Sequence, residues 1–145
     1  MDTEHCRAAF AAARVARLAT MTAHGAPHLV PVTCAVVDDR IVFAVDHKPK
    51  TTTSLRRLAN IAAVPQVSFL ADEYHEDWSR LWWVRADAVA RVLEGGQDRE
   101  TALDVLAGKY QQYRSHRPTG PVVTADVVRW TGWAASAGSS GSLRT

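Results

Sequence analysis

The chain has 145 residues and a mass of 15.9 kDa, which is the size of one ordinary domain. Its 47% hydrophobic and 22% charged residues exclude a disordered or fibrous protein. The formal charge of +2 is too small to indicate a nucleic-acid partner by itself. The two cysteines, Cys6 and Cys34, form neither a CxxC pair nor a zinc-ligand spacing, so we expect no disulfide framework, no structural metal and a reducing cytoplasm.

The first residues do not have the charge pattern of a secretory leader. Asp2 and Glu4 lie where a leader needs positive charge, and Arg14 and Arg17 interrupt the alanine-rich run that follows. We therefore expect neither a signal peptide nor a membrane span.

The first half of the chain predicts one helix followed by an antiparallel meander. A capping signal and alanine-rich filling predict a helix over 3–13. Strands are predicted over 15–22, 28–37 and 40–45, because apolar residues alternate and the segments Ala23-His24-Gly25-Ala26-Pro27 and Asp38-Asp39 provide the turns.

The second half alternates helices with longer strands. A helical stripe of Leu55, Leu58, Ala59 and Ala62 predicts a helix over 51–63. Leu103, Leu106, Tyr110 and Tyr113 recur at helical spacing and predict one further helix that reaches Tyr113. The remaining segments are predicted strands at 66–71, 80–94 and 122–130, and a polar loop at 72–79.

Six strands with antiparallel neighbours and inserted helices predict a mainly β fold, a small β-barrel decorated by helices. A doubly wound α/β sheet is disfavoured because helices and strands do not alternate regularly. We expect a single domain over 1–135, followed by a disordered Ser/Gly-rich tail over 136–145.

The segment Asp46-His47-Lys48-Pro49-Lys50 leads into the helix at Thr51 and is the strongest local signal. Ammonium groups, capping hydroxyls and a helix N-terminus together suit a phosphate or another anion. Arg56 and Asn60 are four residues apart, so one helical face could present both to the same pocket. A solvated basic loop is an equally weighted alternative, which the scarcity of lysine elsewhere in this arginine-rich chain makes slightly less favoured.

Two further features fit a bound planar group. Pro31 interrupts a strand pattern, which predicts a sheet edge, a bulge or a ligand beside that backbone. Trp78, Trp82 and Trp83 cluster within six residues and could stack on a ring system. A packing role is the alternative, and it is favoured for Trp82, which shares a face with small alanines.

Together these segments resemble the pyridoxamine-phosphate-oxidase-like split β-barrel family, and within it the F420-dependent flavin/deazaflavin oxidoreductases of actinobacterial type. The resemblance covers nearly all of the chain before the tail. It is carried by Arg14-Val-Ala-Arg-Leu-Ala-Thr20, Pro27-His-Leu-Val-Pro-Val32, Asp46-His-Lys-Pro-Lys50, Leu55-Arg-Arg-Leu-Ala-Asn-Ile61, Glu76-Asp-Trp-Ser-Arg-Leu-Trp-Trp-Val-Arg85 and Arg129-Trp-Thr-Gly-Trp133.

The resemblance implies a six-stranded, FMN-binding-like split barrel that forms a homodimer, with the cofactor in a groove at the subunit interface. Pro31, Val32 and Thr33 would flank the isoalloxazine-like ring, and Lys48, Lys50 and Arg56 would receive the phosphate and the acidic tail. The candidates for a contribution from the partner subunit are Trp78, Arg80 and Trp82.

The chain departs from true pyridoxamine phosphate oxidases, which carry an Arg-x-Val-Leu-Leu-Lys strand and a C-terminal Arg-x-His motif. Here the strand reads Leu29-Val-Pro-Val-Thr-Cys34 and the chain ends in Gly and Ser. This difference argues against oxidation of vitamin B6.

The resemblance therefore implies a reductase in which reduced F420 passes a hydride to a small, conjugated organic acceptor. An FMN-dependent oxidoreductase that uses the same groove and a non-catalytic cofactor carrier are the alternatives. The cofactor carries the hydride chemistry, so no catalytic side chain needs to be evident in the sequence. The proton donor stays open between solvent, His28, His47 and His75.

Overall fold

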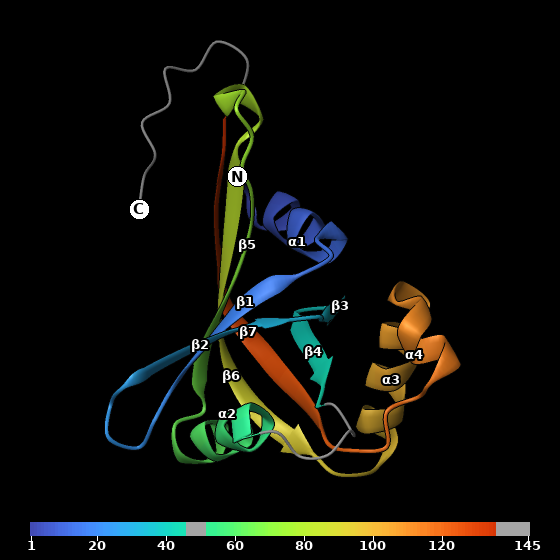
Figure 1. Ribbon diagram of the computed structural model, residues 1–145. Helices are drawn as coiled ribbons and strands as arrows, with labels where there is room; N and C mark the ends of the chain where they lie inside the picture. The colour runs from blue at the N-terminus through green and yellow to red at the C-terminus, as the bar shows by residue number, and fades with distance from the viewer. Residues whose placement is uncertain (46–51, 136–145) are drawn as a thin grey trace.

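A computed structural model gives the structure of residues 1–45 and 52–135 (Figure 1). These residues form one sheet of seven strands, and four α-helices pack around it. All neighbouring strands are antiparallel, in the order β2-β1-β5-β6-β7-β4-β3. The elements are α1 (Thr3–Ala12), β1 (Ala16–Met21), β2 (Pro27–Val32), β3 (Ala35–Val37), β4 (Arg40–Ala44), α2 (Thr52–Ala63), β5 (Gln66–Glu73), the 3-10 turn η1 (Trp78–Arg80), β6 (Trp82–Leu93), α3 (Gln97–Lys109), α4 (Gln111–Ser115) and β7 (Val122–Ala134).

The strand predicted over 28–37 divides into two, which corrects the expected six strands to seven. The division lies at Thr33 and Cys34, before which β2 pairs with β1 and after which β3 pairs with β4. β2 and β3 are the two edges of the sheet. The sheet is therefore not closed by hydrogen bonds, and the chain itself links its two edges. Pro31 lies in edge strand β2, where its missing N–H removes no hydrogen bond from a central ladder.

The main core fills the inner face of the sheet. Phe69 is fully buried at its centre, and the rings of Phe10 and Phe43 each pack edge-to-face against it at 6.2 Å between centroids. Phe10 comes from α1, so this helix covers the inner face. A second cluster forms where Leu103 and Leu106 of α3 pack on residues of β3, β4 and the start of β7.

The helix predicted to run unbroken to Tyr113 is instead interrupted. α3 ends at Lys109, Tyr110 is extended with φ −120° and ψ 120°, and α4 then starts at Gln111. Tertiary contacts favour the break, because the Tyr110 hydroxyl donates to the carbonyl oxygens of Arg14 at 2.9 Å and of Cys34 at 3.2 Å.

Three strands extend the sheet into an arm that projects beyond the core, seen at the top of Figure 1. β5 continues to Glu73 and β7 to Ala134, so both are longer than predicted, and β6 lies between them. The predicted polar loop at 72–79 is displaced to residues 74–81, because β6 also begins later than predicted, and it contains the turn η1. None of the helices in the described part of the chain is long and apolar enough to cross a membrane.

Gly132 of β7 allows α1 to pack closely against the arm. A Cβ at this position would lie 2.7 Å from Cys6 Sγ and 3.1 Å from the Trp83 carbonyl oxygen. We expect Gly132→Ala to lower the free energy of unfolding by about 1–3 kcal/mol, because the helix must shift to relieve the overlap. Urea unfolding measures this loss. Gly95→Ala is the matched control, since no atom lies within 4 Å of its added Cβ, and equal losses in both variants would contradict the packing argument.

Candidate functional site

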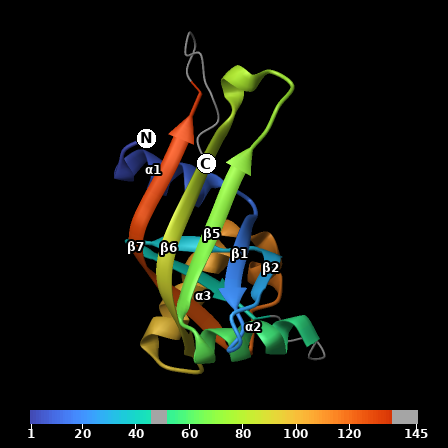
Figure 2. The same cartoon turned by 90° about the vertical axis from the view of Figure 1, so that its left-hand side faces the viewer.

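The outer face of the sheet carries apolar side chains that no helix covers. Figure 2 looks directly at this face, with β7, β6, β5, β1 and β2 side by side and no helix in front of them. Leu29 of β2 is 68% exposed and Leu70 of β5 is 38% exposed. Because such patches on monomeric proteins often mark binding surfaces, this face is the first candidate for the functional site.

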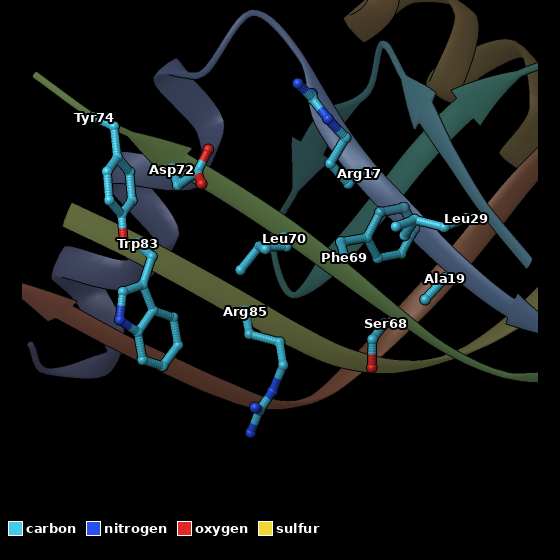
Figure 3. A pocket seen from close by; sticks show the side chains of 10 residues that line it. All are labelled: Arg17, Ala19, Leu29, Ser68, Phe69, Leu70, Asp72, Tyr74, Trp83 and Arg85. Carbon is cyan, nitrogen blue, oxygen red and sulfur yellow. The ribbon is translucent and has the colours of Figure 1, made fainter. Parts of the chain in front are cut away.

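A groove of about 540 Å³ crosses this face over β1, β5 and β6. Its centre is set by strand register, since Leu70 pairs with Arg17 on one side and with Arg85 on the other. In Figure 3 the two arginine side chains extend away from Leu70 in opposite directions, so guanidinium groups border an apolar floor. The lining residues are Arg17, Ala19, Leu29, Ser68, Phe69, Leu70, Asp72, Tyr74, Trp83 and Arg85.

A short polar network holds Arg85 at the border of the groove. Asp87 lies two residues further along the same face of β6, and its Oδ1 is 3.3 Å from Arg85 Nε. The same oxygen accepts a hydrogen bond of 2.9 Å from Ser68 Oγ on β5. The Arg85–Asp87 contact is an ion pair without hydrogen-bond geometry, and Ser68 holds its carboxylate on the sheet.

The corner between β2 and β3 follows the strand whose Leu29 lines the groove, and it is tied to the helical segment α3–α4. Thr33 continues the exposed row of Leu29 and Pro31 on β2, and its Oγ1 lies 3.0 Å from the Tyr113 hydroxyl of α4. Lys109 Nζ donates to the Cys34 carbonyl oxygen at 2.8 Å. None of the three predicted ring-flanking residues lines the groove: Pro31 pairs with Arg17 at its border and is exposed, as is Thr33, whereas Val32 is buried.

Burial at this corner raises the pKa of one group, the Cys34 thiol, and lowers the pKa of another, the Lys109 ammonium group. Burial raises the pKa of the Cys34 thiol from its ordinary 9.0 to about 11, although the nearby Lys109 ammonium opposes this shift. Burial lowers the pKa of Lys109 below its ordinary value. Both shifts disfavour charged forms inside the protein.

Helix α2 presents a different face from the predicted one. Ile61 is buried, whereas Ala59 and Ala62 are exposed, because the larger side chain gains more from burial. Asn60 is also buried, and its Nδ2 donates to Thr20 Oγ1 at 3.1 Å. Arg56 is exposed, so the structure does not bring Arg56 and Asn60 to one pocket.

Arg57, the basic residue next to Arg56 in the same cationic cluster of the sequence, is half-buried on α2. Its guanidinium carbon lies 5.8 Å from the centroid of the Phe43 ring, within the range of a cation–π contact. Burial lowers the pKa of Arg57. The four predicted anion-binding residues His47, Lys48, Pro49 and Lys50 lie outside the described residues.

The predicted aromatic and cationic residues of the arm divide between its tip and its inner face. Trp78 is 66% exposed at the tip, and Arg80 is exposed beside it. Trp82 faces inward with the core, and its Nε1 donates to Glu73 Oε2 at 2.8 Å, which together with His75 holds the pKa of Glu73 below its usual range. Trp83, on the opposite face of β6, is the tryptophan that lines the groove.

The histidines named as possible proton donors do not line the groove in the part of the chain that the structure describes. His28 belongs to β2, and its Nδ1 is buried with no hydrogen-bond partner among residues 1–45 and 52–135. His75 Nε2 lies 3.2 Å from Glu73 Oε1 on the arm. His47 lies outside the described residues. Within the described ranges, no group of three or more His, Cys, Asp or Glu side chains could hold a metal ion.

None of the ten residues that line the groove was among the predicted binding residues, although Trp83 belongs to the tryptophan cluster named from the sequence. The central row of the groove is formed by Arg17, Leu70 and Arg85. The alternation along residues 80–94 already placed Arg85 on the face opposite the alanines. No local pattern identifies its neighbours, because the row from Arg17 to Leu70 to Arg85 joins three strands that are separated in the chain.

Comparison with models of known protein families identifies the family of the chain. The chain is a small antiparallel sheet protein with an exposed apolar sheet face, and the model of the pyridoxamine 5'-phosphate oxidase family matches residues 2–134. The chain belongs to this family. A search of curated proteins finds no match for this sequence.

Several solved structures share the fold at low sequence identity. A conserved hypothetical protein, Rv2991 from Mycobacterium tuberculosis, is 20% identical with a TM-score of 0.75, over 93% of this chain and 86% of that one. A FAD-binding protein from Mesorhizobium loti is 20% identical with a TM-score of 0.70, over 91% and 94% of the two chains. HutZ, a heme storage protein from Vibrio cholerae, is 14% identical with a TM-score of 0.67, over 90% of each chain.

These neighbours share the fold of the chain, and the lining of the groove shows which side chains a ligand would meet. Haem iron is held by His, Cys, Met or Tyr side chains. Among the described lining residues only Tyr74 belongs to this set, and it lies at one end of the groove. The groove has an apolar floor with an indole and guanidinium groups at its borders, which can accept the flat face and the acidic substituents of a planar, anionic group.

Proposed function

We propose that the chain is an oxidoreductase that binds a flavin or deazaflavin on the outer face of the sheet, with F420 as the cofactor and FMN as the alternative. The observation that carries this proposal is the apolar groove bordered by Arg17 and Arg85, beside the exposed end of β2. A tricyclic ring has an apolar face that suits Leu70 and Trp83, and the phosphate of either cofactor needs cations nearby.

In this proposal each part of the site contributes binding or orientation. Pro31, Val32 and Thr33 flank the ring, and Lys48, Lys50 and Arg56 attract the phosphate and the acidic tail, as the family resemblance implies. F420, when bound and reduced, supplies the hydride for a small conjugated acceptor. The chain's own residues orient the ring and exclude water from it, so the rate depends on geometry more than on a single catalytic side chain.

We also propose that a second copy of the chain covers the outer face and completes the groove as a homodimer. Leu29, Leu70 and Met21 project from this face with much of their surface exposed. Asp72 and Asp87 lie on the same face as Arg17 and Arg85, so the surface carries both signs of charge and can complement its own copy. The arm residues Trp78 and Arg80 are then candidates for contact with the partner's cofactor.

Turnover separates an oxidoreductase from a carrier. We expect the protein loaded with reduced F420, under anaerobic conditions, to reoxidise the cofactor when conjugated acceptors are added, and the absorbance of oxidised F420 measures the reaction. The same experiment with reduced FMN tests the alternative. Tight binding of either cofactor without acceptor-dependent reoxidation across a broad panel would contradict the enzymatic role and favour a carrier.

A further inference from the structure

The hydrogen bond between Thr33 and Tyr113 joins the proposed ring-binding strand to the helical segment α3–α4. The two oxygens lie 3.0 Å apart, and Thr33 is exposed at the end of β2. Three side chains hold this junction, since Lys109 and Tyr110 both donate to the carbonyl oxygen of Cys34, the next residue along. The backbone there is already fixed by Lys109 and Tyr110, so the Tyr113 hydroxyl is not required for that purpose.

The hydroxyl groups of Thr33 and Tyr113 have more donor hydrogens than their mutual bond needs. Thr33 and Tyr113 each carry one O–H hydrogen, and their mutual bond uses only one of the two. No other hydrogen bond joins either hydroxyl to a residue in the described ranges. Within the described residues one O–H group therefore has no acceptor, whichever of the two oxygens accepts within the pair.

We propose that Thr33 and Tyr113 form a hydrogen-bonding site for the carbonyl edge of the cofactor ring. This inference rests on the proposed function, which places the ring beside Pro31 and Thr33. Flavins and deazaflavins share a pyrimidinedione edge whose carbonyl oxygens accept hydrogen bonds. A donor whose direction is fixed by a partner hydroxyl orients that edge as well as binding it, because the tyrosine on α4 limits rotation of the threonine side chain.

Removing only the hydroxyl tests the assignment. We expect Tyr113→Phe to weaken FMN or F420 binding roughly threefold to tenfold, the usual effect of losing one neutral hydrogen bond, and to shift the absorption bands of the bound ligand. Thr33→Val is expected to act in the same way. The double variant is expected to lose less than the product of the two single effects, because both substitutions remove the same site.

Tyr110→Phe is the matched control, because it removes a hydroxyl from the same helical segment that bonds only to backbone carbonyls in the described chain. We expect it to lower the urea midpoint while the affinity of the folded protein stays within twofold of wild type. Wild-type affinity and unchanged absorption bands in Tyr113→Phe would overturn the inference and leave the proposed function intact. Failure of the wild-type protein to bind either probe would overturn both.

Discussion

Leu70→Asp is expected to convert a dimer into a folded monomer that no longer binds flavin or deazaflavin. Leu70 lies at the centre of the groove between Arg17 and Arg85, and the proposed second copy buries it. A carboxylate at the centre of an apolar interface must lose its hydration without a built partner, which costs several kcal/mol. We expect the dissociation constant of the dimer to rise roughly 100-fold or more, which sedimentation velocity at micromolar protein measures.

The stability of the subunit separates this effect from unfolding. Leu70 is 38% exposed in the single chain, so the substitution changes the free energy of unfolding of the monomer only slightly. Val15→Asp is the matched control, because Val15 is 42% exposed and lines a different cavity, beside α1. A Leu70→Asp protein that stays dimeric, or a Val15→Asp protein that dissociates equally, would contradict the assignment of the outer face.

The second large effect concerns pH, and the Cys34 thiol causes it. Its pKa is about 11 in the folded chain against an ordinary value of 9.0, so between these values the unfolded state loses a proton that the folded state keeps. Stability therefore falls as the pH rises from 9 to 11. A difference of 2 pKa units corresponds to a loss of about 3 kcal/mol at the end of this range.

Tyr110 and Lys109, at the same corner, also affect the pH dependence between 9 and 11. The effect of Cys34 is therefore measured as the difference between wild type and a variant without the thiol. Burial raises the pKa of Tyr110, which adds to the loss, whereas burial lowers the pKa of Lys109, which opposes it. Cys34→Ala leaves both groups in place and removes the thiol. We expect urea unfolding of this variant to depend less on pH between 9 and 11 than that of wild type, and parallel curves would contradict the burial argument.

The parts of the fold that follow from short-range patterns were predictable. The alternation of residues 80–94 predicted which side chains of β6 face the core and which face outward. The position of Pro31 predicted an edge strand as one of three possibilities, and the sheet order confirms it. The helix predicted over 51–63 also forms, as α2.

Two breaks in the secondary structure were not predicted, because the sequence pattern continues across each of them. Val32, Cys34 and Val36 keep alternating through the corner between β2 and β3, so the sequence does not show that the strand changes its partner. In the same way, the helical spacing from Leu103 to Tyr113 persists across Tyr110. The break there depends on bonds to Arg14 and Cys34, which are distant in the chain and give no local signal.

The candidate site was predictable only where one segment defines it. The cationic segment before α2 is visible as a run of residues, whereas the groove exists because Arg17, Leu70 and Arg85 come into register from three strands. For Asn60 a local pattern gave a wrong prediction. Its helical spacing from Arg56 predicted a shared pocket, but the packing of Ile61 turns Asn60 into the core, where it bonds to Thr20.

A parallel titration of the cofactor-free protein with F420 and with FMN, followed by ligand fluorescence at low and moderate salt, tests the central claim most directly. We expect saturable binding with a preference for F420, weakened by salt because cations hold the acidic tail. Lys50→Ala should reduce both the affinity and the salt dependence without unfolding the protein. Preferential binding of FMN would select the flavin alternative, and binding of neither cofactor would contradict the proposed function.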